Sequence, residues 1–199
     1  MLNTAKSAVY PKWGIGVEIG GYGNIESASY LSPAGYGYVY GYVPGFMSTH
    51  GIRFTAMHQI KLNDAPFGQA VVNTLPRGLS KNTQLLGWLC IRNAAMTKVS
   101  ADYAFPIYIG DHALGGGIFS IKRLVVNPHF DCSFIGGSTL FSVGGELVLG
   151  LNSILALGWP CSFGVTYSYN GGSGYSRFAS ESGITLGRHY VGPTFNVSF

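Results

Sequence analysis

The segment Trp13-Gly14-Ile15-Gly16-Val17-Glu18-Ile19-Gly20 alternates large apolar residues with small or polar ones. Successive side chains of a β-strand point to opposite faces, so a period of two is typical of a strand with one apolar face. The same alternation returns in later segments: 35–42, 52–61, 98–105, 140–151, 161–170 and 194–199. Together with the less regular stretch 117–134, these predict an all-β protein of about eight to ten antiparallel strands in one domain, residues 1–199.

The composition excludes several classes of protein. Glycine contributes 30 of the 199 residues, aromatic residues make up 14%, and charged residues only 10%, against about 25% charged residues in an average soluble domain. A hydrophobic content of 47% argues against disorder. A bundle of membrane helices needs apolar runs of about 18 residues, and glycines interrupt every candidate. The net charge of +4 comes from scattered basic residues, so we expect no nucleic-acid partner.

The two faces of the expected strands favour a transmembrane barrel over a soluble sandwich. One face is aliphatic and aromatic, and we count Tyr36, Tyr38, Tyr40 and Tyr42 with it. The other face is glycine, serine, threonine and an occasional charge, which suits a narrow or filled lumen. Closing the sheet also gives every backbone group in lipid a partner. The lipid bilayer is therefore the first expected partner.

The last strand resembles the C-terminal strand of bacterial outer-membrane barrels. The chain ends Val191-Gly-Pro-Thr-Phe195-Asn-Val197-Ser-Phe199, with apolar residues two, four and eight places before a terminal aromatic residue. In those barrels the terminal aromatic residue is read by the membrane-insertion machinery. The resemblance implies that Val191, Phe195, Val197 and Phe199 form an insertion signal and that this machinery is a partner.

A second resemblance covers residues 70–199. Leu75-Pro76-Arg77-Gly78-Leu79 precedes the segments 100–107, 117–124 and 127–131, and this series is similar to the last strands of the surface-antigen barrel superfamily of assembly and two-partner-secretion transporters. It looks closest to the barrels of propeller-bearing outer-membrane proteins of Gram-negative bacteria. In that superfamily an Arg-Gly-aromatic loop folds into the lumen, and its arginine meets an acidic residue. The resemblance implies that role for Arg77 and Gly78, with Asp131 as the acidic partner, although Leu79 departs from the aromatic position.

The length departs from the superfamily, whose barrels have about sixteen strands. We therefore expect the C-terminal half of a barrel, which needs a missing N-terminal half or a partner chain, or else a smaller closed barrel. The resulting hypothesis is an integral outer-membrane β-barrel segment that anchors in the membrane, with passage or insertion of polypeptide as its further role.

The sequence offers little covalent chemistry. It contains no phosphate-binding loop and no nucleophile elbow, and its histidines and three cysteines lack zinc spacing. We expect no enzyme, cofactor or metal. Two alternatives stay open. One is a soluble or secreted all-β binding module with the four tyrosines as its ligand face. The other is a barrel hydrolase, in which His129 shares a strand face with Asp131.

Overall fold

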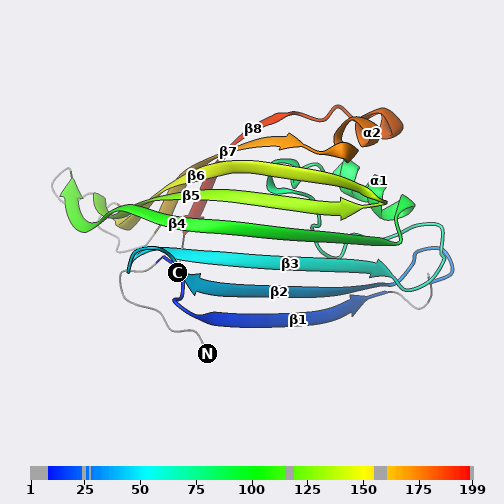
Figure 1. The fold of residues 1–199 in the computed structure, drawn as a ribbon, viewed down its shortest axis with the longest axis horizontal. Helices are drawn as coiled ribbons and strands as arrows, with labels where there is room; N and C mark the ends of the chain where they lie inside the picture. Colours follow the sequence, from blue (N-terminus) through cyan, green and yellow to red (C-terminus); the bar gives the residue numbers. More distant parts are fainter. Residues whose placement is uncertain (1–8, 24–25, 27, 115–118, 155–160, 198–199) are drawn as a thin grey trace.

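The computed structural model describes residues 9–23, 26, 28–114, 119–154 and 161–197. Eight strands dominate it, and helical segments occur in two of the loops (Figure 1). The elements are β1 (Gly14–Tyr22), β2 (Ala34–Pro44), β3 (Gly51–Lys61), η1 (Arg77–Leu79), α1 (Thr83–Arg92), β4 (Ala95–Leu114), β5 (Phe119–Ile135), β6 (Ser138–Ile154), β7 (Cys161–Gly171), α2 (Ser173–Ser182) and β8 (His189–Val197). The expected all-β fold is confirmed.

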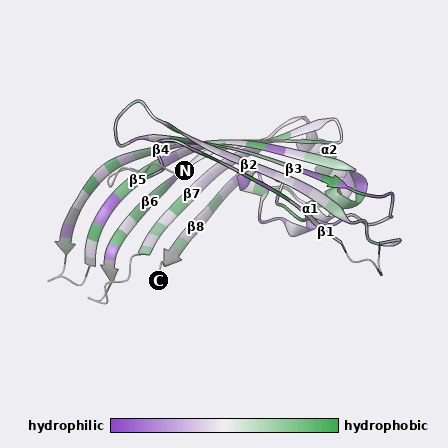
Figure 2. Cartoon of the chain, turned by 90° about the horizontal axis from the view of Figure 1, so that it is seen from below, coloured by the Kyte–Doolittle hydropathy of each residue, from purple (hydrophilic) through white to green (hydrophobic). Residues whose placement is uncertain are grey.

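The strands form one antiparallel meander in the order of the sequence, from β1 to β8. The sequence left open a closed barrel or half of a larger one, and the described part of the chain does not close into a barrel. The sheet is bent like an arch and remains open, with β1 at one edge and β8 at the other (Figures 1 and 2). An eight-stranded barrel has an interior just wide enough for side chains. Here the long loop between β3 and β4 lies against the inner face.

The outer face of the sheet is apolar and exposed on every strand. On β1 the exposed fractions of Ile15, Val17 and Ile19 are 73%, 63% and 83%. Cross-strand register continues this face through the following residues of β2 to β8: Val39, Phe54, Val99, Phe130, Val143, Val165 and Val191. Exposed apolar surface on this scale marks contact with a membrane or with other protein.

The four tyrosines of β2 lie on the inner face, which corrects their assignment to the apolar face. Antiparallel register pairs Tyr38 with Glu18, and Tyr42 with Arg53, so these side chains share the polar face. The rings cross over glycines of β1: a Cβ added at Gly16 would lie 2.5 Å from Cε1 of Tyr40. Alternation along a strand separates two faces, but strand pairing decides which of the two points inward.

Both helices lie outside the segments that the sequence predicts as strands, one between β3 and β4 and the other between β7 and β8. Asn82 caps α1 by accepting a hydrogen bond of 2.9 Å from the Leu85 backbone N–H, and Gly183 ends α2 in the left-handed conformation. The helices join the ends of β4, β5 and β6 in the main apolar cluster at one end of the sheet (Figure 2). Neither helix of the described residues has the length and apolar character needed to cross a membrane.

Candidate functional site

The loop between β3 and β4, residues 62–94, folds back against the inner face of the sheet, and we call it the inner loop. Its path is fixed at several points. The side-chain Oε1 of Gln59 accepts the backbone N–H groups of Val71 and Val72 at 2.8 and 3.0 Å, and the Ser133 hydroxyl donates to the Thr74 carbonyl. The loop contacts buried polar side chains of β4, β5 and β6.

Arg77 lies at the turn of the inner loop and meets two carboxylates of the sheet. Its Nη2 donates to Oδ1 of Asp102 at 2.6 Å, and its Nε lies 3.7 Å from Oδ2 of Asp131. Its backbone N–H donates to the same Oδ2 at 3.0 Å. Both carboxylates are almost fully buried, with side-chain exposures of 2% and 0%. The structure thus brings Arg77 together with Asp131 and with Asp102.

Gly78, the residue after Arg77, lies against β6 and β7. Its backbone N–H donates to the Ser142 hydroxyl at 3.2 Å. A Cβ added at Gly78 would lie 2.8 Å from Cγ of Asn170, closer still to its Oδ1. Asn170 is fully buried, and its Nδ2 donates to the Gly187 carbonyl at 2.9 Å, so it has little room to move. Glycine is therefore required at this position by close packing.

We call Asp102, Asp131, Ser142 and Asn170 the seat of residues 77–78. The last three lie in one cross-strand row: Asp131 pairs with Ser142, and Ser142 with Asn170. Asp102 lies on β4, in the neighbouring row. Because these inward positions come from four adjacent strands, the seat exists only when the sheet is formed.

Sequence reasoning missed Asp102 and Arg53. Arg53 lies opposite Asp102 in the register of β3 and β4, and its Nε and Nη2 donate to Oδ2 of Asp102 at 3.1 and 3.0 Å. The Arg53 guanidinium also lies 5.2 Å from the ring centroid of Tyr10. Two arginines therefore share one buried carboxylate. Both residues stood on the polar face of their predicted strands, but their pairing depends on register.

Lys98 is a further cation beside the seat. It is 9% exposed and lies within electrostatic reach of Asp131 and Asp102. Among the described residues it makes no ion pair within 4.0 Å. The strands alone thus place two cations, Arg53 and Lys98, near two carboxylates.

The residues of the expected insertion signal are only partly described. Val191 and Phe195 lie on the outer face of β8, with exposed fractions of 68% and 62%. Phe195 packs on Phe163 with ring centroids 4.8 Å apart. For Val197 only the strand pairing with Cys161 is described. Phe199 lies outside the described residues.

The hydrolase alternative placed His129 beside Asp131, but its hydrogen-bond partner in the structure is Ser168. Its Nε2 lies 2.9 Å from the hydroxyl of Ser168, and both side chains are buried. Its Nδ1 has no hydrogen-bond partner among the described residues, whereas a general base in a catalytic triad is oriented through that atom. The nearest carboxylates on the inner face are occupied by arginines. Among the described residues, no carboxylate orients His129 as the acidic member of a Ser-His-Asp triad would.

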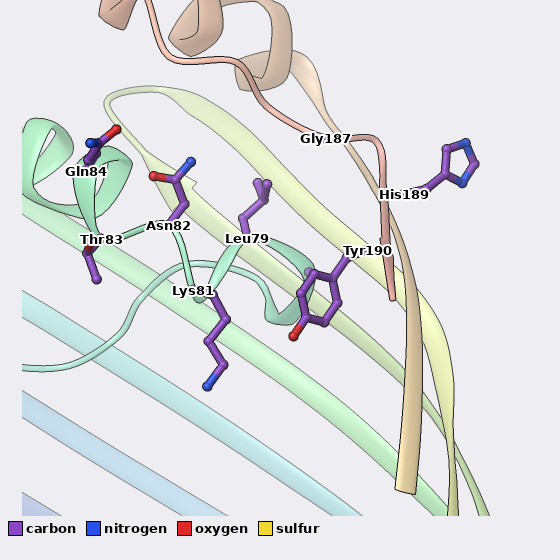
Figure 3. A pocket seen from close by; sticks show the side chains of 9 residues that line it. Leu79, Lys81, Asn82, Thr83, Gln84, Gly187, His189 and Tyr190 are labelled. Carbon is purple, nitrogen blue, oxygen red and sulfur yellow. The ribbon is translucent and has the colours of Figure 1, made fainter. Parts of the chain in front are cut away.

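A hollow of about 440 Å³ lies between the inner loop and β8. Figure 3 shows Leu79 and Lys81 of the loop beside Tyr190 of β8, while His189 points away. The hollow reaches Gly78. In the part of the chain that the structure describes, no group of three or more His, Cys, Asp or Glu residues is arranged to hold a metal ion.

No family model, curated protein or solved structure matches this chain.

Proposed function

We propose that this chain forms part of the wall of an outer-membrane β-barrel of the surface-antigen type, anchored in lipid by its outer face. The inner loop occupies the lumen, and the barrel passes or inserts polypeptide. The observation that carries the proposal is the distribution of polarity between the two faces of the sheet, which is the reverse of that in a soluble protein. All eight strands expose apolar side chains outward, while polar side chains of β4 to β6 that contact the inner loop, namely Asp102, Asp131, Ser133 and Ser142, are buried. A soluble sheet of this size normally buries its apolar face.

The strand lengths support a membrane crossing. A transmembrane β-strand tilted by about 45° needs roughly 9–11 residues. β1 and β8 have 9 residues each, and β2, β3 and β7 have 11 each. β4, β5 and β6 are longer, with 20, 17 and 17 residues, and extend beyond their neighbours at one end of the sheet.

The connections also differ between the two ends of the sheet. At the end where β1 begins and β8 finishes, the strands are joined by the short segments 45–50, 115–118 and 155–160. At the other end lie the longer connections 23–33, 62–94 and 172–188, together with the tight turn at Gly136–Gly137. Outer-membrane barrels have short periplasmic turns and longer extracellular loops. In this proposal the inner loop therefore enters the lumen from the extracellular side.

The wall is incomplete with eight strands. A lumen that holds the inner loop has to be wider than an eight-stranded barrel allows, and within the described residues β1 and β8 each pair with a strand on one side only. Further strands from an N-terminal half or a partner chain complete the wall in this proposal. Unpaired edges are otherwise sites of aggregation.

The alternative of a soluble binding module with a tyrosine platform is less well supported. The tyrosines are not an outward ligand face: they lie inward, over the glycines of β1. Tyr36 is also engaged, because its hydroxyl donates to Glu18 at 2.6 Å.

Two tryptophans test the proposal with a built-in control. Trp13 precedes β1 and is 59% exposed, whereas Trp88 belongs to α1, packs against the apolar cluster and lies 4.8 Å from the Arg92 guanidinium. Variants that keep one of them, with the other tryptophans changed to Phe, are refolded into vesicles containing brominated phospholipid. Quenching of Trp13 with unchanged Trp88 emission supports the proposal. Equal emission of Trp13 in brominated and ordinary vesicles refutes it.

Refolding from urea with and without detergent micelles gives an independent measurement. The proposal expects a far-UV β-signal only with micelles. A folded sheet in plain buffer would favour the soluble module.

A further inference from the structure

A groove crosses the outer face of β1 to β4, and we call it the outer groove. Its volume is about 380 Å³, and its lining residues are Ile15, Val39, Gly41, Phe54, Thr55, Ala56, Val99 and Ser100. The large side chains of Ile15 and Phe54, which are 73% and 49% exposed, stand on the same face as Gly41 and Ala56. The groove exists because Gly41 and Ala56 contribute almost no side chain to a face that is otherwise covered by bulky apolar groups.

A polar pair lies next to the outer groove on the same face. His58 follows Ala56 as the next outward residue of β3, about 7 Å further along the strand, and it is paired in register with Thr97 of β4. Nδ1 of His58 lies 2.8 Å from Oγ1 of Thr97. On the other side of His58 lies Gly37 of β2, where an added Cβ would have no atom within 4 Å. The polar pair is therefore open to a molecule that occupies the outer groove.

The polar pair keeps one hydrogen-bond donor for a group outside the chain. If the Thr97 hydroxyl donates to Nδ1 of His58, the Nε2–H of His58 is left over. If instead the Nδ1–H donates to Oγ1 of Thr97, the hydroxyl hydrogen is left over. These two side chains make no further hydrogen bond within the described residues. On a face that contacts lipid, a donor without an acceptor is costly.

The order of the outer groove and the polar pair along β3 matches the order of groups in a lipid molecule. In the proposed function, the end of β3 at Lys61 lies toward the longer connections and the membrane surface. His58 is three residues before that end, whereas Phe54 and Ala56 lie in the middle of the strand. An acyl chain that starts beside His58 and follows the outer groove therefore runs from the membrane surface toward the centre of the bilayer.

From these observations we propose that the outer groove and the polar pair bind one lipid with ester-linked acyl chains. One acyl chain lies in the groove, and its ester carbonyl oxygen accepts the hydrogen bond that His58 or Thr97 has left. The outer-face neighbours Gly37, Ile60 and Phe134 carry no charge, whereas sites for phosphate are rich in arginine and lysine. The carbonyl oxygen therefore fits the pair better than the phosphate does. This inference rests on the proposed anchoring in lipid.

The test counts lipid molecules on the full chain, refolded in detergent micelles, by native mass spectrometry. The probes are phosphatidylethanolamine with two ester-linked chains and its ether-linked analogue, which lacks both carbonyl groups. We expect the ester lipid to bind about fivefold more tightly, as one hydrogen bond provides. In a variant with His58→Phe and Thr97→Val, the two lipids should bind equally well.

A second variant tests the outer groove. In Ala56→Phe the aromatic ring fills the space between Phe54 and Val99, and we expect both lipids to bind at least tenfold more weakly. Val143→Phe is the matched control, because it adds a ring on the outer face of β6, away from the groove. It should bind both lipids as the unaltered protein does. All these changes place apolar side chains on an apolar exposed face, so the variants are expected to fold.

The possible results separate the lipid site from the proposed function. No lipid binding, equal binding of the ester and ether lipids by the unaltered protein, or unchanged binding by Ala56→Phe overturns the lipid site. So do lipid-free dimers that Ala56→Phe converts to monomers, since a second copy of the chain would then occupy the outer groove. The far-UV β-signal with and without micelles is recorded on the same samples, and it tests the membrane proposal independently of lipid binding.

Discussion

Replacing Gly78 with alanine should loosen the inner loop from its seat. The added methyl group would lie 2.8 Å from Cγ of the buried Asn170, and overpacking of this kind costs about 1–3 kcal/mol. Moving the backbone away to relieve the overlap weakens the 3.2 Å hydrogen bond to Ser142, which contributes about 1 kcal/mol. The sum of about 2–4 kcal/mol corresponds to a roughly 30- to 1,000-fold rise in the open population of the loop.

Labelling of Cys90 measures that population. Cys90 is 1% exposed in α1, and it belongs to the same apolar cluster as Leu75 and Leu79 of the inner loop. It becomes accessible when the loop leaves the sheet. The experiment uses a background with Cys132→Ala and Cys161→Ala, and follows the rate of maleimide reaction with the folded protein.

Gly87 offers a matched control within the same loop. A Cβ added at Gly87 has no atom within 4 Å, and alanine is favoured over glycine by about 1 kcal/mol inside a helix. Gly87→Ala should therefore label no faster than the unaltered protein, and Gly78→Ala combined with Asn170→Gly should label more slowly than Gly78→Ala alone. A labelling rate for Gly78→Ala within threefold of the unaltered protein would refute the packing argument.

Three further predictions follow from the two faces and the buried thiol. Val17→Lys on the outer face should lower the free energy of unfolding in vesicles by about 2–4 kcal/mol. Thr55→Lys on the inner face should lower it by less than about 1 kcal/mol. Equal urea midpoints of the two variants would contradict the assignment of the faces. Gly16→Ala, which meets the Tyr40 ring, should cost about 1–3 kcal/mol, while Gly37→Ala, with open space around it, should change the midpoint little. Burial raises the pKa of the Cys90 thiol. The rate of its labelling in the folded protein should therefore begin to rise at a higher pH than that of a free cysteine. A pH profile equal to that of a free cysteine would show that the thiol is accessible.

Part of the candidate site was available from the sequence. Arg77, Gly78 and the acidic partner Asp131 were implied by the resemblance of residues 70–199 to the surface-antigen barrels. Asp102 was not, because it carries no local signal beyond its place on the same kind of face. Its importance comes from the register that sets it opposite Arg53, and from the fold of the inner loop that brings Arg77 to it.

The helices, too, were only partly predictable from the sequence. Asn82 and Gly183 are recognisable capping residues, but α1 and α2 are short, and their stability comes from the cluster in which Leu85, Leu89 and Phe178 are buried. A short helix of this kind is marginal by itself. Sequence patterns alone therefore leave such segments ambiguous.

By itself, the sequence determined the class of the protein: the period of two, the glycines and the scarcity of charge specify antiparallel strands with one apolar and one polar face. Tertiary structure decided which face points outward, that the tyrosines of β2 lie inward, and that the eight strands form an open arch around the inner loop. The physical reason is that alternation is a local property of each strand. Register, the direction of curvature and the charge pairs of Asp102 depend on contacts between residues far apart in the chain.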